Sequence, residues 1–154
     1  MARVKVKKMA DIIKWLTRPS AGGVSDCLDR GKGNCLPNCV GLCFGLFYFL
    51  HGEKPMEWRA HPRCNANGIY EACKRKGSGF WVQKAVKANS ILCFNTGENG
   101  HVVYCLGKLP DGTWLCLESN YSGTLANGRY FRAFATKTPQ KLYTGYQGCV
   151  YDFT

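Results

Sequence analysis

The hydrophobic and polar positions divide the chain into a first half with helical patterns and a second half with strand patterns. The longest apolar run extends from Cys39 to Leu50 without a charge or a proline, and it follows a loop that contains Pro37 and Asn38. A run of this length after loop-forming and cap-forming residues predicts a buried helix that begins at about Cys39.

Two shorter segments also have a helical pattern. Residues 9–17 form an amphipathic stretch that ends at Arg18-Pro19. Residues 65–75 place Ile69, Tyr70 and Cys73 at helical spacing and carry basic residues at their end, just before a glycine. The first half of the chain is therefore expected to contain several helices.

From residue 90 the pattern changes to that of β-strands. Three short runs rich in β-branched and aromatic residues, 90–94, 101–106 and 113–118, are separated by Gly-rich or Pro-Asp-Gly turns. This arrangement predicts an antiparallel meander. Two later runs, 129–134 and 148–153, would complete a sheet of about five or six strands.

Helices followed by strands predict an α+β domain in which the central helix packs on the sheet. With 154 residues, the chain is long enough for one full core and short for two, so we expect a single domain, with residues 1–25 as a helical extension. The sequence has no apolar stretch long enough to span a membrane and no visible signal peptide, so neither a span nor export by a leader is expected.

The formal net charge of +11 indicates an anionic partner. Nucleic acid, a membrane surface and the phosphate-rich polymers of a cell wall all meet this description, and charge alone does not choose among them. The basic residues are scattered, with small clusters at 3–8 and 74–76. Such clusters are most often solvated surface, so no specific nucleic-acid site is expected.

The chain has ten cysteines. Many lie inside apolar runs, which favours reduced, buried thiols in a cytosolic product over a disulfide framework. The spacings contain no Cys-x-x-Cys pair and no His pair suited to zinc. Asp26 and Asp29 lie in a polar turn and could hold calcium, but the turn is too irregular for an EF-hand, so no metal is expected.

Cys39 is a candidate nucleophile because of its predicted position at a helix N-terminus. The unpaired backbone N–H groups and the positive end of the helix dipole there favour thiolate over thiol. A buried structural thiol is the simpler alternative, because free cysteine is among the most buried residue types.

A cysteine nucleophile needs a base, usually a histidine held by a third polar group. His51 lies at the far end of the predicted helix, about 18 Å from its start at 1.5 Å per residue, which is too far to reach Cys39. His61 precedes a proline in an irregular stretch and has no support. His101 opens a strand directly after a glycine turn, where a rigid strand can present a side chain.

Two polar residues are expected beside His101. Glu118 ends the next strand of the predicted hairpin and Asn120 follows it, so strand pairing brings both near His101. From periodicity alone, a surface histidine and a solvated carboxylate are an equally good interpretation.

The sequence around these residues resembles the CHAP (cysteine, histidine-dependent amidohydrolase/peptidase) family, in particular the endolysins of phages that infect Gram-positive bacteria. The resemblance covers about residues 30 to 135. The segments that carry it are Leu36-Pro37-Asn38-Cys39-Val40-Gly41, Gly100-His101-Val102-Val103 and Glu118-Ser119-Asn120-Tyr121, with Asn65-Ala66 and residues 87–93 in support.

The resemblance implies a papain-like (NlpC/P60-type) fold and a role for each matching residue. Cys39 would be the nucleophile, His101 the general base and acid, and Glu118 the group that orients His101, with Asn120 assisting. Cys35 is a competing nucleophile, but it lacks the following Val-Gly and helix. The developing oxyanion would be held by the backbone N–H of Cys39 together with Asn38 or Asn34.

The implied function is hydrolysis of an amide bond in Gram-positive peptidoglycan, without a cofactor. The bond is either the one joining N-acetylmuramic acid to L-alanine or a peptide bond of the stem or cross-bridge. The enzyme would be made in the host cytoplasm and act at the cell wall, without a separate wall-binding domain, as an endolysin or a tail-associated lysin. The alternatives are a non-catalytic basic module that binds wall polymer or nucleic acid, and a cysteine peptidase that acts on proteins.

Overall fold

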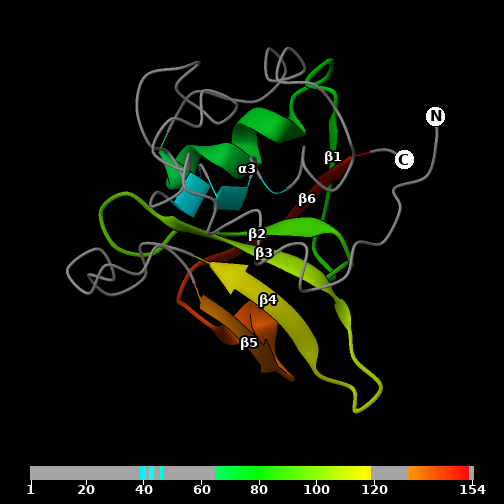
Figure 1. The fold of residues 1–154 in the computed structure, drawn as a ribbon. Coiled ribbons are helices and arrows are strands. Elements are labelled where there is room, and N and C mark those ends of the chain that lie inside the picture. Colours follow the sequence, from blue (N-terminus) through cyan, green and yellow to red (C-terminus); the bar gives the residue numbers. More distant parts are fainter. Residues whose placement is uncertain (1–38, 41, 44–45, 47–64, 119–131, 153–154) are drawn as a thin grey trace, which may run out of the picture.

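Helix α3 and a six-stranded antiparallel sheet form most of the described structure (Figure 1). The computed structural model describes residues 39–40, 42–43, 46, 65–118 and 132–152. The elements are α3 (Ala66–Lys74), β1 (Phe80–Gln83), β2 (Ser90–Phe94), β3 (His101–Lys108), β4 (Trp114–Glu118), β5 (Arg132–Thr136), the short 3-10 helix η4 (Pro139–Lys141) and β6 (Tyr146–Asp152). The α+β class predicted from the sequence is confirmed for these residues.

The strand order is β1-β6-β2-β3-β4-β5, with every neighbouring pair antiparallel. Strands β2 to β5 follow one another in space as in sequence, which confirms the predicted meander. Strand β6 returns from the far edge and lies between β1 and β2. The last strand of the chain therefore belongs to the middle of the sheet, next to the strand that precedes His101.

The structure adds one strand to the prediction and changes the bounds of others. Strand β1 was not expected, although residues 80–83 are an aromatic and β-branched run after a Gly-Ser-Gly turn. The described part of β5 extends to Thr136, two residues beyond the predicted end, and β6 begins at Tyr146 rather than at residue 148. Both strands lengthen because ladder pairing with β4 and β2 continues beyond the apolar runs.

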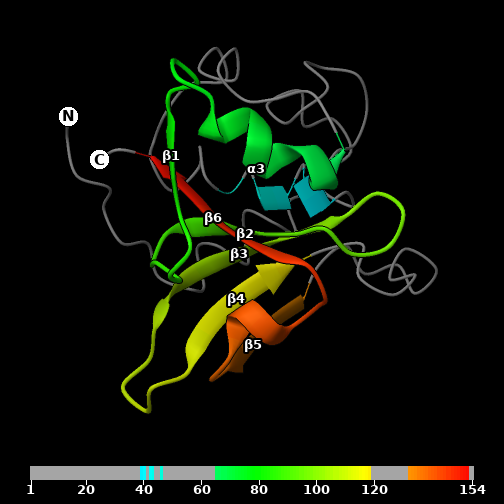
Figure 2. The same cartoon turned by 180° about the vertical axis from the view of Figure 1, so that it is seen from behind.

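The sheet is buried on both faces by side chains that alternate along each strand. On one face, Ile91 and Cys93 pack with α3 and with the described helical residues of the 39–50 run; on the other, Leu92 and Phe94 form a second cluster. The helical residues are Cys39, Val40, Leu42, Cys43 and Leu46, and all are buried. The predicted central helix is thus confirmed at these positions, and Figure 2 shows it beside α3 from behind.

Seven cysteines fall within the described residues, and all are buried. They come from the helical layer and from strands β2, β3, β4 and β6 (Cys39, Cys43, Cys73, Cys93, Cys105, Cys116 and Cys149). For this part of the chain, the expectation of buried cysteines inside apolar runs is confirmed.

The described helices include none that is long and apolar enough to cross a membrane. The predicted helix at 9–17, the extension at 1–25 and the polar turn with Asp26 and Asp29 lie outside the described residues.

Candidate active site

The loop before β3 fixes the start of that strand against helix α3. The backbone N–H of Asn67 donates to the carbonyl of Asn99 at 2.8 Å, and the Asn67 side-chain amide donates to the carbonyl of Glu98 at 3.3 Å. The amide of Asn65, at the N-cap of α3, donates to the side chain of Asn99 at 3.3 Å. His101 follows two residues later, so its backbone is held from both the sheet and the helix.

Gly100 is the loop residue whose backbone lies closest to helix α3. Its φ is +75°, and a Cβ at this position would collide with the backbone of Asn67. Gly97, in the same loop, has a φ of +63° but open space where a Cβ would be. Of these two loop glycines, Gly100 alone combines a left-handed backbone with a close approach to the helix.

We expect Gly100→Ala to lower the free energy of unfolding by about 3 kcal/mol, because it adds a steric clash to the 1–2 kcal/mol of left-handed strain. Gly97→Ala is the matched control and should lose about 1 kcal/mol from strain alone. Urea unfolding followed by circular dichroism measures both. Equal losses in the two variants would show that the contact with Asn67 does not matter.

His101 and Glu118 meet at the end of the β3–β4 ladder. Tyr104 pairs with Leu117, so Glu118 is a diagonal neighbour of His101 on the same face, within reach of long side chains. His101 Nε2 lies 2.7 Å from Glu118 Oε1. The His101 side chain is 7% exposed and that of Glu118 is fully buried, which strengthens a charged hydrogen bond. The predicted approach of these two residues is confirmed.

Two further side chains bind the Glu118 carboxylate. Arg132, directly opposite Glu118 on β5, donates from Nε to Oε2 at 2.6 Å, and its Nη2 forms an ion pair with the same oxygen at 2.6 Å. Tyr143, after η4, donates its hydroxyl to Oε1 at 2.8 Å. The buried carboxylate thus accepts hydrogen bonds on both oxygens, which satisfies its charge without water.

Cys39 lies near the same imidazole, on the side of the helical layer. Hydrogen bonding and charge from Cys39 are among the causes that raise the pKa of His101. Because Glu118 holds Nε2, the nitrogen left for the thiol is Nδ1. The structure therefore brings together three of the predicted site residues in the order thiol, imidazole and carboxylate.

Cys39 and Cys43, which lie on the same helical segment, differ in how deeply their thiols are buried. Cys39 is 7% exposed, the highest value among the seven described cysteines, whereas Cys43 is fully buried. Burial raises the pKa of Cys43 well above its ordinary value, with a further contribution from the charge of Cys39. Cys43 is therefore an inert thiol beside a site that reaches solvent.

The neighbours of His101 control its charge. Burial on its own would lower the pKa of His101, but hydrogen bonds to Cys39 and Glu118 and the negative charge of both outweigh it and raise the pKa to about 9. Burial would likewise raise the pKa of Glu118, but hydrogen bonds from His101, Tyr143 and Arg132 bring it below its ordinary value. At neutral pH the site contains an imidazolium beside a carboxylate.

These shifts predict how stability depends on pH. Because the folded pKa of His101 is raised from 6.5 to about 9, its contribution is complete below pH 6.5 and is lost as the pH rises through 9. The Glu118 contribution is complete above its ordinary pKa of 4.5 and is lost as the pH falls through its lower folded value. Between pH 6.5 and 10, we expect the free energy of unfolding of wild type to fall by about 3 kcal/mol more than that of His101→Gln. Urea unfolding at each pH measures both. Parallel curves would contradict the raised pKa.

Several residues that were considered for the site lie outside the described part of the chain. These are Asn120, the oxyanion candidates Asn38 and Asn34, the alternative nucleophile Cys35, the histidines His51 and His61, and the acidic pair Asp26 and Asp29. Within the described ranges, no three His, Cys, Asp or Glu side chains are grouped so that they could hold a metal ion.

Sequence reasoning missed Arg132 and Tyr143. Arg132 sits in a predicted strand, but its register depended on a long connection after Glu118 and could not be counted from a short turn. Tyr143 lies in a segment without a periodic pattern, and nothing in the sequence marks it as a ligand of Glu118.

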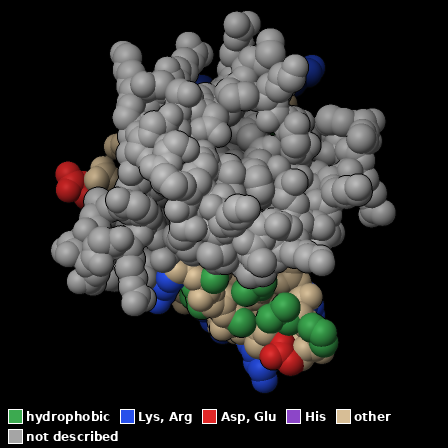
Figure 3. Space-filling view, in the orientation of Figure 1, with side chains coloured by type: hydrophobic (Ala, Val, Ile, Leu, Met, Phe, Trp, Pro, Cys, Tyr) green, Lys and Arg blue, Asp and Glu red, His purple; other side chains and the backbone are tan. Residues whose placement is uncertain are grey.

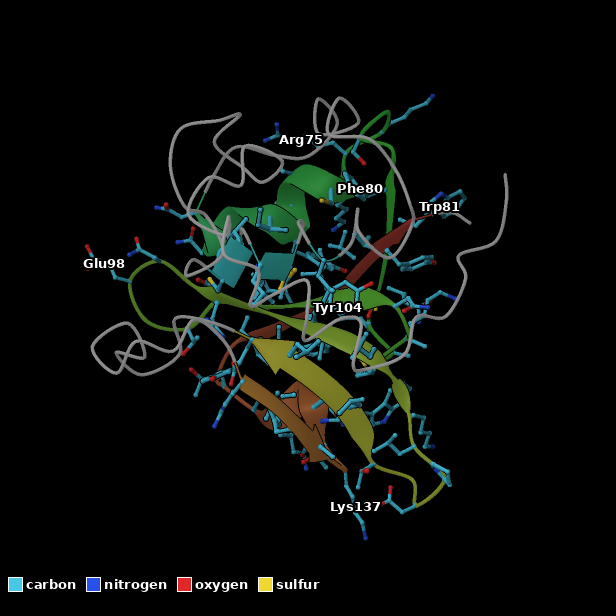
Figure 4. All side chains as sticks on the ribbon, in the orientation of Figure 1. Arg75, Phe80, Trp81, Glu98, Tyr104 and Lys137 are labelled. Atoms are coloured by element: carbon cyan, nitrogen blue, oxygen red, sulfur yellow. The ribbon has the colours of Figure 1, made fainter. Side chains whose placement is uncertain are left out.

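The described surface at the β4 and β5 end mixes hydrophobic, basic and acidic side chains (Figure 3). Two of the basic groups lie over aromatic rings, Lys108 over Trp114 at 5.6 Å and Arg132 over Phe134 at 4.7 Å. Elsewhere, Trp81 points outward from β1 and is half exposed, whereas Tyr104 lies inside the molecule (Figure 4). On this evidence several of the described cations pack on aromatic rings of their own chain.

No protein-family model, curated protein or solved structure matches this chain. What defines the site is therefore its geometry, a Cys–His–Glu arrangement between the helical layer and one end of an antiparallel sheet.

Proposed function

We propose that the protein is a cysteine-dependent amidohydrolase of the CHAP type that cleaves peptidoglycan of Gram-positive cell walls. The observation that carries the proposal is the imidazole of His101, whose Nε2 binds Glu118 Oε1 at 2.7 Å, with Cys39 near enough to raise its pKa. A nucleophile, a base and a buried orienting carboxylate in this order suit acyl transfer. The papain-like (NlpC/P60-type) topology and a single catalytic domain belong to the same proposal.

The proposed reaction is a sequence of bond changes. The Cys39 sulfur attacks the amide carbonyl carbon, while the backbone N–H of Cys39 and a second donor, Asn38 or Asn34, stabilise the oxyanion. The His101 imidazolium gives its proton to the leaving amine, and the C–N bond breaks to leave a thioester. His101 then takes a proton from water, whose oxygen attacks the thioester and releases the carboxylic acid and Cys39.

Glu118 keeps His101 ready for both proton transfers. Its buried carboxylate holds Nε2 as a donor and stabilises the imidazolium, so Nδ1 is the nitrogen that exchanges the proton. No step in this scheme requires a metal or a cofactor.

The charge of the chain supports the choice of substrate. A formal net charge of +11 favours residence on a wall rich in teichoic phosphates, and this attraction acts over about one Debye length, 8 Å at physiological salt. The proposed setting is synthesis in the host cytoplasm followed by action at the cell wall, as for an endolysin or a tail-associated lysin.

The test is digestion of purified Gram-positive peptidoglycan, with the released fragments identified by mass spectrometry. Release of fragments by wild type is the expected result. A free lactyl group on muramic acid would define an amidase, and a new peptide amine and carboxylate would define an endopeptidase. Digestion of casein without release from walls of several chemotypes would instead assign a protein-directed peptidase, and no hydrolysis at all would favour a binding module.

A further inference from the structure

Tyr143 contacts both polar partners of the site at once. Its hydroxyl donates to Glu118 Oε1 at 2.8 Å, the same oxygen that His101 Nε2 binds at 2.7 Å. Its ring meets the imidazole edge to face, with centroids 4.8 Å apart. One side chain thus limits both the position of the carboxylate and the rotation of the imidazole.

The chain around Tyr143 is itself held firmly. The Tyr143 ring packs edge-on against Phe94 at 5.5 Å. The next two residues are tied to the end of β2: the Thr144 hydroxyl lies 3.0 Å from that of Thr96, and the N–H of Asn95 donates to the carbonyl of Gly145 at 2.7 Å. Tyr143 is therefore a rigid wall of the site, placed by the strand that precedes His101.

Tyr143 also keeps its proton. Burial and the hydrogen bond to Glu118 raise the pKa of Tyr143 well above its ordinary value, so the hydroxyl is a donor throughout the working range of pH. The other titratable groups that act on Glu118 are His101 and Arg132, with Cys43 as a weak contributor through the helical layer.

We propose that Tyr143 is a positioning residue of the hydrolase, which holds the Glu118 carboxylate and the His101 ring in the geometry that keeps Nδ1 directed at Cys39. This inference rests on the proposed function. It also extends the functional unit beyond residue 135, where the resemblance to the CHAP family ends, because the segment that follows β5 supplies a direct partner of the catalytic carboxylate.

The test compares Tyr143→Phe with Tyr146→Phe. Tyr146 is a matched control, because its ring also packs on Phe94, at 5.4 Å, and its hydroxyl also donates to an acceptor, the carbonyl of Lys84 at 2.7 Å. We expect Tyr143→Phe to lower kcat about tenfold at unchanged KM, since one hydrogen bond to a charged group is lost. The acid limb of the kcat–pH profile should move to higher pH by about half a unit or more, because Glu118 loses a donor that favours its ionised form. Tyr146→Phe should change neither quantity.

A second readout needs no substrate. The rate at which iodoacetamide alkylates Cys39, followed by peptide mass spectrometry from pH 4 to 8, reports the same imidazole geometry. Slower alkylation and an acid limb at higher pH, seen in Tyr143→Phe but not in Tyr146→Phe, support the positioning role. If wild type releases nothing from peptidoglycan, that result counts only against the proposed substrate. Equal behaviour of the two variants in alkylation and in hydrolysis would overturn the inference.

Discussion

Cys39→Ala is expected to abolish hydrolysis of peptidoglycan, with a loss of about 10⁵-fold or more, the scale seen when a nucleophile is removed from a catalytic unit. Without the sulfur no thioester can form, and the remaining His101 and Glu118 have no attacking group to serve. The measurement is the initial rate of release of soluble wall fragments at equal protein concentration. The fold should persist, because alanine differs from cysteine only by the loss of one sulfur atom.

Cys43→Ala is the matched control for that result. Cys43 lies on the same helical segment and is fully buried, and burial raises its pKa, so it takes no part in the chemistry. We expect full activity and a loss of about 1 kcal/mol in stability from the small cavity. If both variants stayed folded and both lost activity, the assignment of Cys39 rather than Cys43 as the nucleophile would be contradicted.

Glu118→Gln is expected to lower kcat about 100-fold or more, because the amide cannot stabilise the imidazolium and presents N–H groups to existing donors. The carboxylate accepts from His101, Arg132 and Tyr143, so an amide nitrogen at either oxygen position meets a donor. The pKa of His101, raised to about 9 in wild type, should fall toward 6.5. The alkaline limb of the activity profile should therefore move to lower pH.

The control for Glu118 is Glu71→Gln. Glu71 is an exposed residue of α3, so the same chemical change there should leave the activity and the alkaline limb within about twofold of wild type. An alkaline limb that stays in place in Glu118→Gln would show that the carboxylate does not control the charge of His101.

Local sequence patterns were sufficient to predict the helices and strands on which the described candidate residues lie. The change from helical to alternating periodicity located α3 and strands β2 to β4, and the Pro-Asp-Gly turn set the β3–β4 register that brings Glu118 to His101. A short turn leaves little freedom in how two strands pair. His101 and Glu118 could therefore be brought together from the hairpin, whereas the place of Cys39 beside them was implied by the resemblance to the CHAP family.

The partners beyond that hairpin depend on long-range packing. Arg132 is paired with Glu118 across a ladder whose strands are joined by a long connection, and Tyr143 arrives from a segment without a regular pattern. The insertion of β6 between β1 and β2 also follows from no local signal. Tertiary contacts of this kind are set by the whole core, which single-sequence periodicity does not encode.

The most direct test of the central claim is a titration of Cys39 with iodoacetamide at pH 6, in which residual hydrolysis of peptidoglycan is plotted against the fraction of Cys39 alkylated. Peptide mass spectrometry gives that fraction and shows which of the ten cysteines react. The account predicts that Cys39 reacts first among the described cysteines and that activity falls in proportion, reaching zero at one modification per chain. Full alkylation of Cys39 with activity retained would contradict it.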